Sequence, residues 1–177
     1  MSVATIEGRM GSGMTLTVVF LAYRAFKEGR EVVSNFKLNF PYTKLDPANP
    51  FYTGSTIIVD DASIHLVATP NLLTALIMAR RHGNTFLLTC HQVDQLDLRV
   101  RRLVETRIKV NQYPRDTFNV LALNLQDGSR HKFSFDGKPY YPLYDTFQII
   151  PPPPRLPVVT GTGYWRESVI DMIREIE

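Results

Sequence analysis

Gly8-Arg9-Met10-Gly11-Ser12-Gly13-Met14-Thr15 is the stretch on which the fold prediction rests. It matches the phosphate-binding pattern GxxxxGK[ST] at every position except the one where Met14 replaces lysine. The glycines let backbone N–H groups converge on phosphate oxygens, and the N-terminus of a following helix adds positive partial charge. The stretch predicts a nucleotide-binding loop with the Thr15 hydroxyl on Mg²⁺; the alternative is a glycine-rich turn without a ligand.

The residues on either side of the loop predict the elements that a phosphate loop requires. Val3 to Ile6 is a short β-favouring run. Met14 to Glu28 is rich in apolar residues and is followed by Gly29, a natural helix stop, before a second β segment over Glu31 to Ser34. We therefore expect strand, loop, helix and strand in this order.

The middle of the chain predicts a parallel sheet. Ser55 to Val59 and Thr85 to Thr89 are continuous apolar runs without alternation, which is typical of strands buried on both faces. Pro70 to His82 has the spacing of a helix between them, whereas Asn35 to Gly54 contains three prolines and predicts a long ordered loop. Strands alternating with helices indicate an α/β fold, mainly a parallel sheet flanked by helices.

The last third predicts an antiparallel β extension of this sheet and a terminal helix. Asp127-Gly128 favours a hairpin turn between the last two of three β-favouring segments, 106–111, 118–125 and 131–135. Residues 151–154 are all proline and predict an extended spacer, followed by an amphipathic helix over Trp165 to Ile176. We expect a P-loop domain over residues 1–150 and a spacer with a helix over 151–177.

The composition is that of an ordinary globular domain. The 177 residues include 44% apolar and 21% charged residues, with a formal net charge of +3. The single cysteine, Cys90, excludes an internal disulfide, and the histidines lack the spacing of zinc ligands. Since the sequence contains neither a signal peptide nor a stretch long enough to span a membrane, we expect a cytoplasmic protein.

A second motif strengthens the nucleotide interpretation. Ile57 to Val59 is an apolar strand that ends in Asp60 and Asp61, the form of a Walker B segment. In such a segment the first carboxylate holds Mg²⁺ and the second can polarise the attacking water. Paired acids after a strand also form turns, so the prediction depends on their following the glycine loop in the expected order.

On these motifs the chain resembles the FtsK/HerA branch of P-loop ATPases, particularly zonular-occludens-toxin-like and viral genome-packaging ATPases. The resemblance covers roughly residues 3–110 and rests on IEGRMGSGMT, GREVVSNFKL, STIIVDD and TFLLTCHQVDQLDLRVR. It implies a RecA-like domain that assembles as a homo-oligomeric ring and uses ATP and Mg²⁺ to translocate or package DNA. A viral origin would place it in the host cytoplasm.

The resemblance assigns roles and shows three departures. Asp60 corresponds to the Mg²⁺ acid, Asp61 replaces the usual catalytic glutamate, and Cys90 or His91 stands where relatives have a polar sensor. With Met14 in place of lysine, these departures imply slow or absent hydrolysis. His91 either contacts the γ-phosphate or the attacking water, or is a hydrogen-bonded residue at a strand end.

The arginines have two interpretations each. Arg80 and Arg81 either present a finger to a neighbouring subunit's nucleotide or complement the dipole of the helix they end. Arg9 either reaches over the phosphates in place of the missing lysine or is solvated. Arg99, Arg101 and Arg102 either face nucleic acid or a subunit interface, or form a solvated surface.

Two further functions remain open. One is an ATPase for virion assembly or export with a protein cargo; chains of the toxin-like type usually contain a membrane span, so its absence here favours packaging. The other is a nucleotide-binding subunit with little hydrolysis because of Met14.

Overall fold

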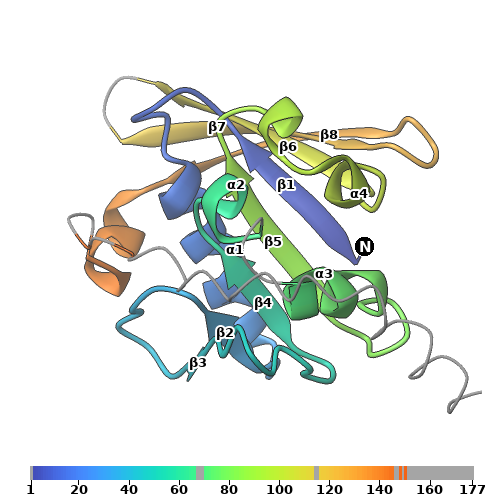
Figure 1. Cartoon of the computed structure of the whole chain (residues 1–177). Helices are drawn as coiled ribbons and strands as arrows, with labels where there is room; N and C mark the ends of the chain where they lie inside the picture. Colours follow the sequence, from blue (N-terminus) through green and yellow to red (C-terminus); the bar gives the residue numbers. More distant parts are fainter. Residues whose placement is uncertain (1, 67–69, 114–115, 146–147, 149, 151–177) are drawn as a thin grey trace, which may run out of the picture.

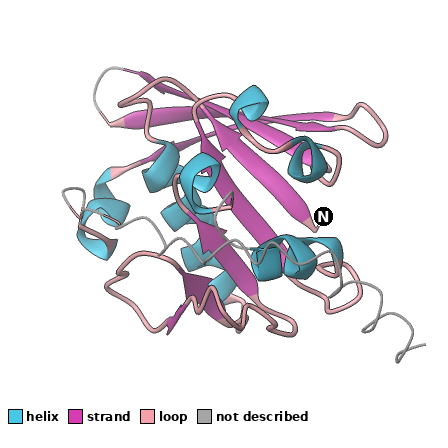
Figure 2. Cartoon of the chain, in the orientation of Figure 1, coloured by secondary structure: helices cyan, strands magenta, loops and turns pink. Residues whose placement is uncertain are grey.

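The computed structural model describes residues 2–66, 70–113, 116–145, 148 and 150. Within them one mixed sheet has the strand order β3-β2-β4-β5-β1-β6-β7-β8 (Figures 1 and 2). The predicted proline spacer and terminal helix lie outside the described residues. The strands are β1 (Val3–Glu7), β2 (Val32–Ser34), β3 (Thr43–Lys44), β4 (Thr56–Val59), β5 (Thr85–Cys90), β6 (Thr106–Tyr113), β7 (Thr117–Asn124) and β8 (Arg130–Asp136).

The predicted parallel sheet is confirmed. β1 pairs in parallel with β5 and β6, and β4 pairs in parallel with β2 and β5. β1, β2 and β4 are buried at every position, because both faces of this part of the sheet are covered. Their carboxyl ends meet at one edge, where Glu7, Asp60 and His91 follow or end adjacent strands.

Helices cover the two faces of this sheet. α1 (Met14–Lys27) packs on one face and joins a buried cluster with Ile6, Ile58 and Leu87. α3 (Pro70–Ile77) packs on the other face, together with the short helices α2 (Ala62–His65) and α4 (Leu98–Arg101), as Figure 1 shows. α1 begins at Met14, directly after Gly13, so the helix predicted after the glycine loop is confirmed.

Several details differ from the sequence prediction. The helix predicted over Pro70 to His82 ends at Ile77, because the chain continues in successive turns to Gly83, which has a left-handed φ of 67°. The predicted loop over residues 35–54 contains the edge strand β3, which pairs in parallel with β2. α2 and the 3₁₀ segments η1 (Val93–Gln95) and η2 (Lys138–Leu143) have no counterpart in the prediction.

The predicted antiparallel extension is confirmed as part of the same sheet. β6 joins it to β1 by parallel pairing, and β7 pairs antiparallel with both β6 and β8. The Asp127-Gly128 turn lies between β7 and β8, with Gly128 at a φ of 71° and the Asp127 carboxylate accepting from the Ser129 N–H.

The extension packs against the start of α1 through aromatic rings. Phe118 and Phe135 lie 5.3 Å apart between ring centroids, and Phe135 stacks on Phe20 of α1 at 4.2 Å. Gly13, which caps α1 with a φ of 91°, has the Phe118 ring where a side chain would be: a Cβ there would lie 2.2 Å from it. The extension therefore fixes the position of the phosphate loop from the side.

We predict that Gly13→Ala is more destabilising than Gly29→Ala. Both glycines have left-handed φ values, 91° and 83°, so both substitutions incur backbone strain of about 1 kcal/mol. Only at Gly13 does the new methyl group meet Phe118, and forcing a methyl into a packed site costs about 1–3 kcal/mol more. Urea unfolding of both variants measures the difference. Equal losses would show that Phe118 moves aside freely.

Candidate nucleotide site

The glycine loop leaves the N-terminus of α1 open toward a pocket. Gly11 and Gly13 have left-handed φ values of 76° and 91°, and the Ser12 N–H donates to the Arg9 carbonyl at 2.9 Å. No side chain caps α1, and its first turn contains no acidic residue. Since the first N–H groups of a helix have no partner within it, this end offers donors and positive partial charge to an anion.

Thr15 and Asp60 meet at this end of the helix, as the sequence predicts. The Thr15 hydroxyl donates to the Asp60 carboxylate at 3.2 and 3.3 Å, although 45 residues separate them in the chain. Thr15 is the second residue of α1, and Asp60 directly follows β4. A hydroxyl and a carboxylate oxygen are the hard ligands that Mg²⁺ prefers.

Asn35 and Thr89 hold Asp60 in place. The Asn35 side chain accepts from the Asp60 N–H at 2.9 Å and donates to the Asp60 carbonyl at 3.0 Å. The Thr89 hydroxyl donates to the Asp60 carboxylate at 2.5 Å and accepts from the Asp61 N–H at 2.9 Å. Asn35 follows β2 and Thr89 belongs to β5, so the Asp60 backbone is held from one neighbour of β4 and its carboxylate from the other.

Burial raises the pKa of the Asp60 carboxyl above its ordinary value of 3.8. The hydrogen bond from Thr89 opposes this, the charge of Asp61 adds to it, and the hydrogen bond from Thr15 opposes it again. The side chain is only 7% exposed, so an ionised Asp60 is poorly solvated in the protein alone. A cation beside Thr15 and Asp60 would offset that cost, which fits a divalent metal at this position.

The pocket above the loop has a volume of about 600 Å³. Its described lining contains three aspartates, Asp60, Asp61 and Asp145, and one histidine, but neither lysine nor arginine. Met14 lines it where the motif has lysine, and its side chain packs against the core cluster of α1. The rest of the lining is aromatic, amide or aliphatic: Met10, Leu16, Phe36, Gln112, Phe118, Tyr141, Tyr144, Gln148 and Ile150.

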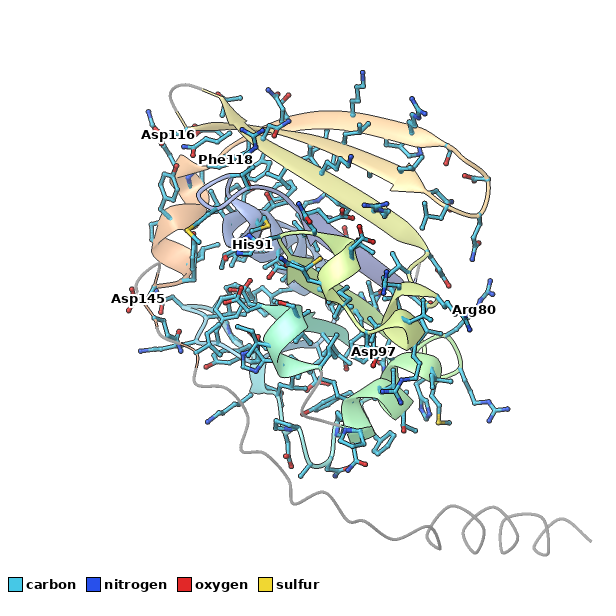
Figure 3. All side chains as sticks on the ribbon, turned by 45° about the horizontal axis from the view of Figure 1, so that its top comes forward. Arg80, His91, Asp97, Asp116, Phe118 and Asp145 are labelled. Carbon is cyan, nitrogen blue, oxygen red and sulfur yellow. The ribbon has the colours of Figure 1, made fainter. Side chains whose placement is uncertain are left out.

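The structure brings most of the predicted site residues together. Met10, Gly11, Gly13, Met14, Thr15, Asp60, Asp61 and His91 all line this pocket. Asp61 is exposed and has a left-handed φ of 52° at the start of α2. His91 is exposed just beyond β5 (Figure 3). Burial raises the pKa of the neighbouring Cys90 thiol to about 12, which leaves His91 as the accessible side chain of that pair.

Five predicted residues lie elsewhere. Gly8 and Arg9 line a second hollow of about 810 Å³ on the other side of the loop, and Arg9 is exposed there. Arg80 and Arg81 are exposed beyond α3, at the opposite edge of the sheet, and Figure 3 shows Arg80 far from His91. Ser12 is buried beneath the loop, where its Oγ has no described hydrogen-bond partner. Arg80 and Arg81 therefore lie outside this chain's own pocket.

Several residues of the site were missed from the sequence. Thr89 is the last residue of a largely apolar run, and Asn35 is the first residue of the predicted loop, so neither position indicates a functional side chain. Phe118 and Tyr141 enter the pocket because the extension folds back against α1, which no local pattern indicates.

We predict that Asp60→Asn raises the stability of the protein without ligand at neutral pH. The amide keeps an acceptor for Thr89 but removes a buried negative charge. Because the folded-state pKa of Asp60 is raised, ionisation of its carboxyl lowers the free energy of unfolding. This loss of stability develops as pH rises from 3.8 through the folded-state pKa. It is absent below 3.8, where the carboxyl is protonated in both the folded and the unfolded state. A gain of about 1 kcal/mol would raise Tm by roughly 2–4 °C.

Thermal unfolding at neutral and acid pH measures this gain. Asp61→Asn is the comparison, because asparagine tolerates the left-handed backbone of Asp61 and only the charge repulsion on Asp60 is removed. Since burial is the larger cause of the raised pKa of Asp60, this variant is expected to gain less stability. A loss of stability in Asp60→Asn at neutral pH would contradict the account of the buried carboxylate.

No described helix is both apolar enough and long enough to cross a bilayer. No protein-family model matches the sequence, and neither does any curated protein.

Solved structures, by contrast, share the fold. The N-terminal domain of zonular occludens toxin from Neisseria meningitidis has a TM-score of 0.59 at 21% identity, over 81% of this chain and 98% of that one. The genome packaging NTPase of Sulfolobus turreted icosahedral virus 2, in complex with ATP-γ-S, has a TM-score of 0.55 at 13% identity, over 74% and 96%. The DNA-packaging ATPase of Sulfolobus turreted icosahedral virus has a TM-score of 0.55 at 15% identity, over the same shares. The resemblance expected from the motifs is thus confirmed for the fold: this chain has the P-loop NTPase fold, with a mainly parallel sheet and an antiparallel extension.

Proposed function

We propose that this chain is a P-loop NTPase that binds ATP with Mg²⁺ and hydrolyses it to translocate or package DNA, as in viral genome packaging. The contact between Thr15 and Asp60, beside the open N-terminus of α1, is the observation that supports nucleotide binding most directly. The likeness to two viral packaging NTPases, one solved with an ATP analogue, supports the choice of nucleotide and of DNA as cargo.

The loop, the two aspartates and His91 have distinct roles in this proposal. The loop amides from Gly8 to Thr15 hold the phosphates, and Thr15 and Asp60 hold Mg²⁺, which when bound neutralises charge on the β- and γ-phosphates. Asp61 and His91 are exposed on the same pocket and orient the attacking water. Thr89 and Asn35 keep the Asp60 carboxylate directed at Thr15.

The proposal assigns the missing positive charge to a second copy of the chain. The described lining of the pocket contains three carboxylates and no lysine or arginine, so a polyphosphate there has only helix N–H groups and the metal ion to neutralise it. Arg80 and Arg81 are exposed at the far edge of the domain. A homo-oligomeric ring in the cytoplasm, or in a host's cytoplasm, would bring them to a neighbour's nucleotide.

Met14 supports a second function, a nucleotide-binding subunit with little hydrolysis. Its thioether cannot contact the phosphates as a lysine ammonium does, and it packs partly against the core. The fold of the toxin domain likewise keeps an assembly or export ATPase with a virion or assembly protein as cargo among the alternatives. Nucleotide turnover, measured with and without DNA, separates these three.

We predict that ATP binds only weakly without Mg²⁺ and that Asp60→Asn removes the gain that Mg²⁺ gives. The expected loss is about tenfold or more in affinity, or about 1.4 kcal/mol, because the metal loses its carboxylate ligand. Calorimetric titration with ATP, with and without Mg²⁺, measures it. This variant is expected to be more stable than the natural protein, so lost binding cannot be attributed to unfolding. ATP that fails to bind the folded natural protein would refute the proposed function.

We predict that Met14→Lys strengthens ATP binding and raises turnover. A charge-assisted hydrogen bond to phosphate contributes about 1.5–3 kcal/mol, which is roughly a 10- to 100-fold gain in affinity. Ile77→Lys is the control: Ile77 is 60% exposed on α3 and does not line the pocket, so this variant adds the same charge outside the site. Equal effects of the two variants would mean that the gain is only one of net charge.

A further inference from the structure

One face of the antiparallel extension is a regular array of cations and amides. The strand registers place these residues in three rows across β6, β7 and β8, one residue from each strand. The rows are Arg107–Leu123–Arg130, Lys109–Leu121–Lys132 and Asn111–Asn119–Ser134. We call these nine residues the cationic face.

The cationic face is not covered by the helices that cover the same side of the parallel strands. The alternate residues of β6, β7 and β8, such as Ile108, Val120 and Phe135, point to the opposite side and pack with α1. The buried cluster under α2, α3 and α4 includes no described residue of β6, β7 or β8. Lys109, Arg130 and Lys132 are exposed, and Figure 3 shows nitrogen-tipped side chains along these strands.

The charge of this face is of one sign. It contains four cations and no carboxylate. Arg107 is paired with Glu7 of β1 at 2.6 and 2.8 Å, whereas Lys109, Arg130 and Lys132 have no ion pair with any described residue. Because rows on a strand repeat about every 6.8 Å and neighbouring strands lie about 4.8 Å apart, the cations form two lines about 10 Å apart, with leucines between them.

The face is also hollowed. Lys109, Asn111, Asn119, Leu121, Lys132 and Ser134 line a hollow of about 430 Å³. Lys109 and Asn111 also line the larger hollow that contains Arg107, Arg9 and His91. The two hollows therefore share a border on β6. The larger one also contains Glu7, which is paired with Arg107, and Asp94, so the surface of one charge sign is confined to the extension.

We propose that the cationic face binds the phosphate backbone of nucleic acid. Lysine and arginine neutralise phosphates, while asparagine and serine side chains are common neutral donors to phosphate oxygens, so both kinds of row fit this ligand. No aromatic residue belongs to the face, so it has no ring on which a base could stack, and contacts to phosphates carry no base-sequence information. This inference specifies where the proposed DNA cargo binds and rests on that part of the proposed function.

An acidic protein segment is the competing occupant. It would be attracted by the same lysines and arginines, and the two leucines would suit its apolar side chains. Ser134 donates to the Asn119 carbonyl oxygen at 2.9 Å, which leaves the Asn119 N–H groups available to a phosphate or a carboxylate alike. Nucleic acid is favoured because the cations repeat regularly along β6 and β8, as the charges of a phosphate backbone do.

The test is the salt dependence of binding to a short fluorescein-labelled DNA duplex without nucleotide, measured by anisotropy from about 50 to 200 mM salt. For the natural protein we expect steep weakening as salt rises. For Lys109→Gln with Lys132→Gln, the slope of log affinity against log salt falls by about 1.8, or about 0.9 for each lost phosphate contact. Lys27→Gln with Lys44→Gln, an equal change of charge at exposed sites on α1 and β3, leaves the slope unchanged.

The other outcomes overturn the inference. An unchanged slope in the Lys109 and Lys132 variant, equal losses in both double variants, or binding to poly-L-glutamate in preference to DNA would each do so. Calorimetric titration with ATP and Mg²⁺ on the same proteins keeps this result separate from the nucleotide proposal. If the Lys109 and Lys132 variant loses DNA binding but still binds ATP, the result supports the cationic face. If the natural protein does not bind ATP, the result contradicts the nucleotide proposal and leaves the cationic face unaffected.

Discussion

The buried carboxylate of Asp60 is the constraint on which the rest of the site depends. The poorly solvated carboxylate at the end of a central strand accepts hydrogen bonds from Thr15 and Thr89, and the Asn35 amide holds the Asp60 backbone. The elements that supply these partners therefore have to lie next to β4: β2 and β5 on either side, and the first turn of α1 above. The strand order of the parallel half satisfies that requirement.

The parts of this arrangement that could be predicted are those that a short stretch of sequence indicates by itself. Glycines before an apolar helix, and acids after a continuous apolar strand, locate the loop and Asp60 without knowledge of the fold. Thr89 and Asn35 could not be assigned, because their importance arises from which strands are neighbours. The end of α3 at Ile77 was likewise missed, since helical spacing continues in the sequence after the backbone has changed to turns.

The charged residues that line the pocket suit a metal ion better than a phosphate. The hydroxyl and the carboxylate proposed to hold a metal ion are in contact, whereas the described lining of the pocket contains no lysine or arginine for a phosphate. Arg9, the nearest arginine in sequence, belongs to the hollow on the other side of the loop. In the proposed function, a triphosphate in this pocket would therefore need positive charge from a metal ion or from a second copy of the chain.

The Phe118 ring against Gly13 has a mechanical consequence. The Phe118 side chain of β7 packs directly against Gly13, the residue that caps α1, with no space between them. Lifting the hairpin from the loop would open a void as large as a phenyl ring, which packed interiors resist. A force applied to β7 and β8 would therefore displace the glycine loop together with these strands, because the packed ring leaves them no room to move independently.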